Sequence, residues 1–282
     1  MLATATRNAA RGAICAVRGD LGLGFGVTTC FSGTASQVIW QGQRVLDATE
    51  FDEYLSSTVA SRLEDTEQGK DFEADMRALA STGVATDTLE DLLQTEPARK
   101  PWEVGEALAE CVLEEGRGVT WPWNMERDKR TPKVSLPGAD IVGFLVEDDD
   151  IYMALGEVKT SFDAKRPPEV LYGRGGMITQ LDRLAREPAI HLSLLKWLYA
   201  RCKSTIFWPM YQQATARYLR SGGREIVLFG LLMRDMDPHE HDIQGRAQSL
   251  ASQVVAPTRV ELTAWHLPRP ISNWPQIAAR SA

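Results

Sequence analysis

The sequence predicts an α/β fold, in which helices flank a mixed central sheet and an N-terminal extension precedes this core. Apolar runs rich in β-branched residues indicate buried strands, and they lie at residues 141–146, 151–155, 225–232 and 260–265. Helical patterns alternate with these runs, at residues 102–116, 177–186, 190–202 and 209–220. With 282 residues, of which 44% are hydrophobic, the chain can bury a full core around such a sheet.

Two prolines, Pro97 and Pro101, mark the clearest boundary along the chain. Proline donates no backbone hydrogen bond and disfavours regular structure, so a linker is expected between them. We therefore expect an acidic α+β extension at residues 1–97 and the main α/β domain at residues 98–282.

The elements before the first apolar strand of the main domain can be assigned from local patterns. Residues 21–46 predict short strands around a turn, and residues 50–96 predict two or three acidic helices. Pro101 then opens a helix that Gly116 or Gly118 closes. The next segment, residues 119–123, is expected to be a strand.

A β-hairpin with charged residues at one end follows. Its strands, residues 141–146 and 151–155, are joined by an acidic turn. Asp140 directly precedes the first strand, and Glu157 and Lys159 continue the second. Because Glu157 and Lys159 are two residues apart, their side chains leave the same face of the strand, and antiparallel pairing can bring Asp140 beside them. Charge at this position on buried strands indicates a metal site or a reaction.

These residue types suit the hydrolysis of a phosphodiester. Magnesium prefers oxygen ligands and keeps several waters, so it needs only one or two carboxylates from the protein. Asp140 and Glu157 would supply them, with the carbonyl of Val158 as a further ligand for Mg²⁺ or Mn²⁺. Lys159 would orient the attacking water or stabilise developing negative charge. The alternative is structural, with a salt bridge between Glu157 and Lys159 and a turn capped by Asp140.

The motif Pro137-Gly138-Ala139-Asp140 with Glu157-Val158-Lys159 resembles that of the PD-(D/E)XK nuclease superfamily. The resemblance covers roughly residues 101–232 and implies a restriction-endonuclease-like core of order αβββαβ. Many members carry a glutamate on the helix before the first strand, and some carry a glutamine on the helix after the lysine strand. These features imply catalytic roles for Asp140, Glu157, Lys159, Glu106 or Glu110, and Gln180.

The resemblance implies a metal-dependent nuclease that hydrolyses phosphodiester bonds in DNA. Double-stranded DNA is the expected substrate, and RNA stays open. The arrangement is similar to nucleases of bacterial anti-phage or restriction-type defence, including the nuclease partner in helicase-coupled, Hachiman-type systems. Control by a partner protein such as a helicase is therefore expected. The alternative is a non-catalytic nucleic-acid-binding or scaffold subunit that keeps the nuclease-like fold.

The distribution of charge agrees with a local binding surface for a polyanion. The net charge is −7, but residues 44–96 hold 14 acids and 4 bases, whereas residues 159–224 hold 12 bases and 4 acids. The basic part directly follows the carboxylate and lysine cluster, so it is expected to contact phosphates. The alternative is that the acidic and the basic segments form two ordinary solvated faces. The candidate nucleic-acid contacts are Lys165, Arg166, Arg174 and Arg183.

Two further groups of residues have a functional and a structural interpretation. Asp237, His239 and His241 could bind a transition metal, although a solvated loop is favoured by the proline among them. Aromatic residues among the bases of residues 196–217 could stack on nucleobases, although core packing is the commoner role of such spacing; they are Trp197, Phe207, Trp208 and Tyr211.

Two observations bear on localisation. No stretch approaches the roughly 20 apolar residues of a membrane-spanning helix, so no membrane association is expected. The four cysteines are far apart and lack the spacing of metal ligands, which indicates reduced thiols and a cytoplasmic protein; they are Cys15, Cys30, Cys111 and Cys202.

Overall fold

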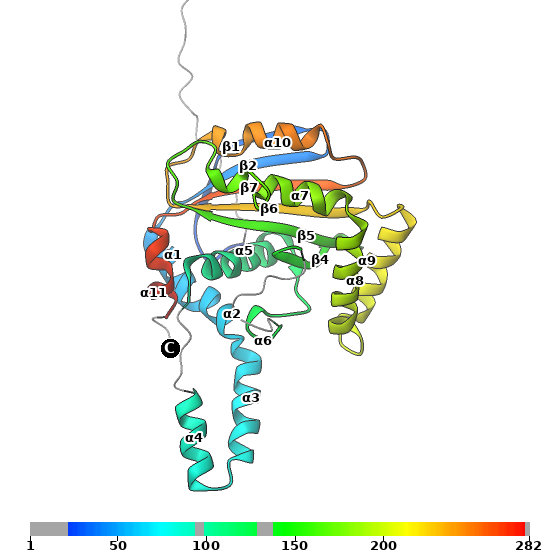
Figure 1. Cartoon of the computed structure of the whole chain (residues 1–282). Coiled ribbons are helices and arrows are strands. Elements are labelled where there is room, and N and C mark those ends of the chain that lie inside the picture. The colour runs from blue at the N-terminus through cyan, green and yellow to red at the C-terminus, as the bar shows by residue number, and fades with distance from the viewer. Residues whose placement is uncertain (1–21, 94–98, 129–137, 280–282) are drawn as a thin grey trace, which may run out of the picture.

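One seven-stranded mixed sheet runs through the computed structural model, which describes residues 22–93, 99–128 and 138–279 (Figure 1). The strand order is β1-β2-β7-β6-β5-β4-β3. The strands are β1 (Val27–Ala35), β2 (Val38–Val45), β3 (Val119–Thr120), β4 (Ile141–Glu147), β5 (Asp150–Ser161), β6 (Ile226–Arg234) and β7 (Arg259–His266). The four central strands β2, β7, β6 and β5 pair in parallel with one another. At the edges, β1 pairs antiparallel with β2, β4 pairs antiparallel with β5, and β3 pairs antiparallel with β4. The expected α/β class with a mixed sheet is confirmed.

Helices cover both faces of this sheet (Figure 1). One face packs against α5 (Pro101–Arg117), with α1 (Ala48–Tyr54), the π-helix η1 (Leu55–Val59) and α11 (Trp274–Ala278) around it. The other face packs against α7 (Met177–Arg186), α8 (Pro188–Cys202), α9 (Trp208–Arg220) and α10 (Gln244–Ala251). Five further helices are short: α2 (Ala60–Glu64), α6 (Met125–Asp128), η2 (Glu169–Leu171), η3 (Glu240–Asp242) and η4 (Ile271–Asn273).

The expected N-terminal extension shares its sheet with the rest of the chain. Strand β2 pairs in parallel with β7, with Val38 opposite Val260. Phe51 and Leu55 are fully buried in the same apolar cluster as Leu108 of α5. A division of the chain after residue 97 therefore does not separate two sheets or two cores. The pairing joins segments more than 200 residues apart, which local sequence patterns do not reveal.

Two helices of the N-terminal part project away from the sheet as a hairpin (Figure 1). They are α3 (Thr66–Leu79) and α4 (Gly83–Leu93). Arg77 ties them together, because it forms ion pairs with Glu73 of α3, at 2.7 Å, and with Glu90 of α4. Several apolar side chains on this hairpin are exposed: Phe72, Leu79, Val84 and Leu92.

Strand β3 is shorter than the expected strand at residues 119–123. It ends at Thr120, because Pro122 has no N–H to donate to a ladder. The buried Trp123 instead donates its indole N–H to the carbonyl of Val142, at 2.6 Å. The expected helix after Pro101 is confirmed, and its C-cap is Gly118, in the left-handed conformation with φ +68°.

Helix α5 lies directly on β5 at one glycine. A Cβ on Gly105 would overlap Oγ1 of Thr160, so a larger residue requires the Thr160 side chain or the helix to move. Across the described residues, no helix is both long and apolar enough to cross a membrane.

Gly105→Ala is expected to lower the free energy of unfolding by about 1–3 kcal/mol, because overpacking displaces α5 from β5. Adding Thr160→Ala should recover most of this loss, since it removes the overlapping hydroxyl. Gly69→Ala, at an exposed position in α3, is the control and should stabilise by about 0.5–1 kcal/mol. Urea unfolding measures all three, and a Gly105→Ala variant as stable as the native chain would contradict the close packing.

Candidate functional site

The candidate site lies where β5 extends beyond the start of β4. Strand β4 begins with Ile141 opposite Gly156, whereas β5 continues to Ser161. Asp140 precedes β4, and its N–H donates to the carbonyl of Gly156 at 3.0 Å. Gly138 has φ +91°, a conformation that favours glycine, so the chain can turn into the strand at this point. The carboxylate of Asp140 is thereby held beside the unpaired edge of β5.

A cavity of about 480 Å³ opens at this edge. Helix α5 contributes Trp102 and Glu106 to its wall, and α7 contributes Gln180. The other lining residues belong to the hairpin or to neighbouring loops: Gly138, Ala139, Asp140, Glu157, Val158, Lys159, Thr160 and Gly175. The structure thus brings together five of the six residues expected to be catalytic, from three separate elements. Pro137, which opens the motif, lies outside the described residues.

The sixth expected residue, Glu110, is not in this cavity. It is 1% exposed, and one of its carboxylate oxygens accepts from Nε of Arg62 at 2.5 Å. Four residues along a helix advance the chain by about 6 Å, so Glu110 lies one turn too far from the end of the sheet. Of the two glutamates of α5, Glu106 lines the cavity, whereas Glu110 belongs to a buried ion pair.

The charged side chains of the cavity are tied to one another and to the backbone. Lys159 Nζ donates to Oε1 of Glu157 at 2.6 Å. Oδ2 of Asp140 accepts from the N–H of Val158 at 3.0 Å. The pKa of Glu157 is raised to about 7, because burial and the negative charge of Asp140 raise it more than Lys159 lowers it. Two carboxyl groups are therefore held close enough for one to disfavour ionisation of the other.

The donor set fits a hard divalent cation. In a strand, the N–H and C=O of one residue point to the same side, and the N–H of Val158 points to Asp140. The carbonyl of Val158 therefore faces the same side, beyond the start of β4. Within the described ranges, no group of three or more His, Cys, Asp and Glu side chains is arranged to hold a metal. Two carboxylates and one carbonyl are a set that magnesium can complete with water, whereas structural zinc requires four protein ligands.

Three of the four expected nucleic-acid contacts have partners on the protein. Lys165 forms an ion pair with Glu169, and Arg183 binds both carboxylate oxygens of Glu187, at 2.8 and 3.1 Å. Arg166 donates to the carbonyl of Asp237 and lies 4.0 Å from the carboxylate of Asp242. The fourth, Arg174, is exposed and adjoins Gly175 in the cavity wall. It is the best placed of the four to meet a phosphate at the site.

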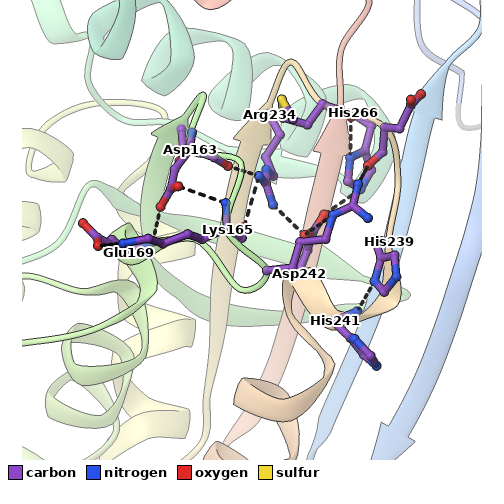
Figure 2. A network of polar contacts seen from close by, with 12 residues as sticks. Asp163, Lys165, Glu169, Arg234, His239, His241, Asp242 and His266 are labelled. Carbon is purple, nitrogen blue, oxygen red and sulfur yellow. Dashed lines mark hydrogen bonds and ion pairs between the residues drawn. The ribbon is translucent and has the colours of Figure 1, made fainter.

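A buried polar cluster lies just beyond the site, at the ends of β5, β6 and β7 (Figure 2). Arg234, at the end of β6, is fully buried and pairs with Asp242 at 2.5 Å. It also donates to the carbonyls of Asp163 and Lys165, in the segment that follows β5. His266 donates from Nδ1 to the carbonyl of Met236, at 3.1 Å, and burial lowers its pKa to about 4. Arg234 therefore holds in place the segment that follows β5, the strand that carries Lys159.

Two of the suggested transition-metal ligands, His239 and His241, lie beside this cluster (Figure 2). His239 and His241 are near each other, but Asp237 is exposed and pairs with Arg44 at 3.6 Å. The three do not form a metal-binding group among the described residues, and the loop interpretation holds. Sequence reasoning assigned no role to Arg234, Asp242 or His266. Arg234 and His266 end the apolar runs of β6 and β7, whereas Asp242 lies in the polar segment that follows β6.

Trp197, Phe207, Trp208 and Tyr211 are partly buried and pack against the core. Trp208 stacks on Tyr211 with ring centroids 5.3 Å apart, and Trp197 lies edge-on to Trp123 at 5.3 Å. Phe207 also packs against the apolar cluster between the sheet and helices α7 to α10. Core packing, the alternative to base stacking, accounts for them.

The raised pKa of Glu157 predicts a pH dependence of stability. The folded chain keeps the Glu157 proton to higher pH than the unfolded chain, whose pKa is the ordinary 4.5. The free energy of unfolding should therefore fall as the pH rises from about 4.5 to about 7 and then level off. Urea unfolding across this window should show a shallower fall for Glu157→Gln than for the native chain. Parallel curves for the two proteins would contradict the shifted pKa.

Comparisons with protein-family models, with curated proteins and with solved structures found no match to this chain.

Proposed function

We propose that this chain is a metal-dependent nuclease of PD-(D/E)XK type that hydrolyses phosphodiester bonds in DNA. The observation that carries the proposal is the convergence of Asp140, Glu157 and Lys159 with Glu106 and Gln180 in one cavity. Isolated structural roles account for each residue separately, but they give no reason for five polar side chains from α5, the hairpin and α7 to line one cavity.

Each residue of the cavity has a role in this proposal. Asp140 and Glu157, with the carbonyl of Val158, would hold Mg²⁺ or Mn²⁺. When bound, such an ion stabilises charge on the phosphoryl oxygens and lowers the pKa of water. Lys159, whose ammonium group is at Glu157, orients the attacking water and faces the charge that develops on the phosphate. Glu106 and Gln180, on the walls, position water or the scissile phosphate.

The proposed substrate is double-stranded DNA, with RNA as the alternative. Arg174 and the glycines around it offer a charged side chain and accessible backbone N–H groups to a phosphate next to the cavity. Phosphate contacts do not distinguish DNA from RNA, because that distinction depends on recognition of the 2′-hydroxyl. A role in bacterial anti-phage or restriction-type defence belongs to this proposal.

A non-catalytic nucleic-acid-binding subunit is the second candidate. The pairing of Lys159 with Glu157, and of Asp140 with the N–H of Val158, favours it, because these contacts satisfy charged groups without a cation. On this account the hairpin keeps its charges for stability. Cleavage assays separate it from the nuclease.

Control by a partner protein, such as a helicase or another ATPase, is also proposed. The projecting α3–α4 hairpin supports it, because Phe72, Leu79 and Val84 are exposed there and exposed apolar groups commonly mark interaction sites. Deleting residues 1–96 would also remove β1 and β2 from the sheet, so a change in activity could not be assigned to the loss of partner control. Removing the hairpin alone, residues 66–93, leaves the sheet strands in place.

We expect the purified chain to cleave plasmid or linear duplex DNA with Mg²⁺ or Mn²⁺ and to lose this activity in EDTA. Lys159→Met should lower the cleavage rate by about 100-fold or more, because it removes the cation at the reacting phosphate. Lys70→Met, which removes an exposed lysine of α3 outside the cavity, is the control and should keep most of the activity. Metal-dependent cleavage that Lys159→Met leaves unchanged would refute the site, and DNA binding without cleavage would support the non-catalytic subunit.

A further inference from the structure

A second cavity, of about 640 Å³, lies at the opposite end of α7 from the candidate nuclease site. Gln180, in the first half of α7, lines the nuclease site, whereas Ala185 and Arg186, at the end of α7, line the second cavity. The turn between α9 and β6 and the loop between α10 and β7 complete its walls. Its volume is in the range of small-molecule sites, which is about 300–1,000 Å³.

Among the described residues that line this cavity, none is acidic, so its charged side chains are basic. Arg186 shares its guanidinium with Asp182, at 2.6 Å, and with Gln253, at 3.3 Å. The guanidinium of Arg224, in contrast to that of Arg186, forms no ion pair with a carboxylate of the described residues. Its Nε donates to the carbonyl of Ser221 at 3.4 Å. The two terminal NH2 groups of Arg224 therefore offer N–H donors and a positive charge at the cavity.

The remaining walls are apolar or internally satisfied. Leu219 and Val255 are 65% and 61% exposed, and both line the cavity. His191 is buried, with Nε2 at 2.5 Å from the carbonyl of Leu184 and Nδ1 at 2.8 Å from the hydroxyl of Tyr218. Both ring nitrogens are thus engaged within the wall. The cavity combines one available guanidinium with apolar surface, which is the composition of a site for an anion that carries an apolar group.

We propose that this cavity binds a small organic anion, a phosphate or carboxylate carried on an apolar body. Arg224 binds the anionic group, because a guanidinium presents paired N–H donors that match two oxygens of either group. The apolar body lies against Leu219 and Val255. The proposal uses no residue of the candidate nuclease site and does not rest on the proposed function.

Four probes test the proposal on the full-length protein. They are 1-naphthyl phosphate and 1-naphthoate, which carry the two anionic groups on one apolar body, 1-naphthol, which lacks the charge, and inorganic phosphate, which lacks the body. Calorimetry or naphthyl fluorescence should show at least one of the two naphthyl anions binding with a Kd of about 1 mM or below. We expect inorganic phosphate and 1-naphthol to bind about tenfold more weakly or not at all.

Two variants and a control assign the site. Arg224→Gln should weaken the affinity for the anion by about tenfold or more, because it removes a charge-assisted hydrogen bond. Val255→Trp should weaken it by narrowing the cavity while Arg224 is kept. Arg220→Gln, which removes an exposed arginine of α9 that does not line the cavity, should leave binding unchanged. Absence of binding by both anions, or equal losses in Arg224→Gln and Arg220→Gln, overturns the proposal.

Discussion

Glu157→Gln is expected to lower the rate of DNA cleavage by about 100-fold or more, while the protein stays folded. Glutamine keeps the shape of the side chain but removes the negative charge that would hold the cation. It also removes the repulsion between Glu157 and Asp140 that contributes to the raised pKa of Glu157. The loss of the Lys159 ion pair opposes that gain, so we expect thermal unfolding to shift by only a few degrees. Cleavage rate and melting temperature are the two measurements.

The control for this prediction is Glu169→Gln, which also removes a carboxylate paired with a lysine. Glu169 is exposed and lies outside the cavity, so cleavage should be unaffected. A variant Glu157→Gln that cleaves at the native rate would show that the carboxylate holds no essential cation. If Glu157→Gln loses both cleavage and cooperative unfolding, cleavage rate and melting temperature should be measured for Glu157→Asp instead. Aspartate keeps the carboxylate but shortens the side chain by one methylene.

Arg234→Met is expected to lower the free energy of unfolding by about 3–5 kcal/mol. Both partners of the Arg234–Asp242 ion pair are 0% exposed. Methionine would leave the Asp242 carboxylate buried without its compensating charge. It would also leave the carbonyls of Asp163 and Lys165 without the donor that holds the segment after β5 (Figure 2). Urea unfolding measures the loss.

A double variant separates the buried charge from general damage to packing. Arg234→Met with Asp242→Leu should be more stable than Arg234→Met alone, because no unpaired charge remains. Arg183→Met, which breaks the exposed pair with Glu187, should cost no more than about 1 kcal/mol. The account of the cluster fails if Arg234→Met and Arg183→Met have equal effects.

The sequence predicted those parts of the fold whose signals are local. Helix α7 occupies Met177–Arg186, as its apolar periodicity indicated, and the hairpin of β4 and β5 follows from two apolar runs around an acidic turn. The pairing of β2 with β7 was not predictable in this way, because the two strands are separated by more than 200 residues. Strand partners so far apart are selected by tertiary packing.

The same distinction applies to the site. Strand alternation predicted that Glu157 and Lys159 share a face, and the structure pairs them. Helical spacing placed Glu106 and Glu110 on similar faces of α5, and only the position of Arg62 on α2 shows that Glu110 is engaged elsewhere. The role of Arg234 depends on partners from distant segments, so its sequence neighbours carry no signal for it.

The central claim is that Asp140 and Glu157 together hold a divalent cation at the end of β5. Anomalous diffraction from crystals soaked in MnCl₂ tests it most directly. The account predicts a manganese peak bound by both carboxylates at about 2.0–2.6 Å, with the ammonium of Lys159 displaced from its present contact with Oε1 of Glu157. A cavity without a manganese peak, with Lys159 still paired to Glu157, would contradict the account and favour a structural ion pair.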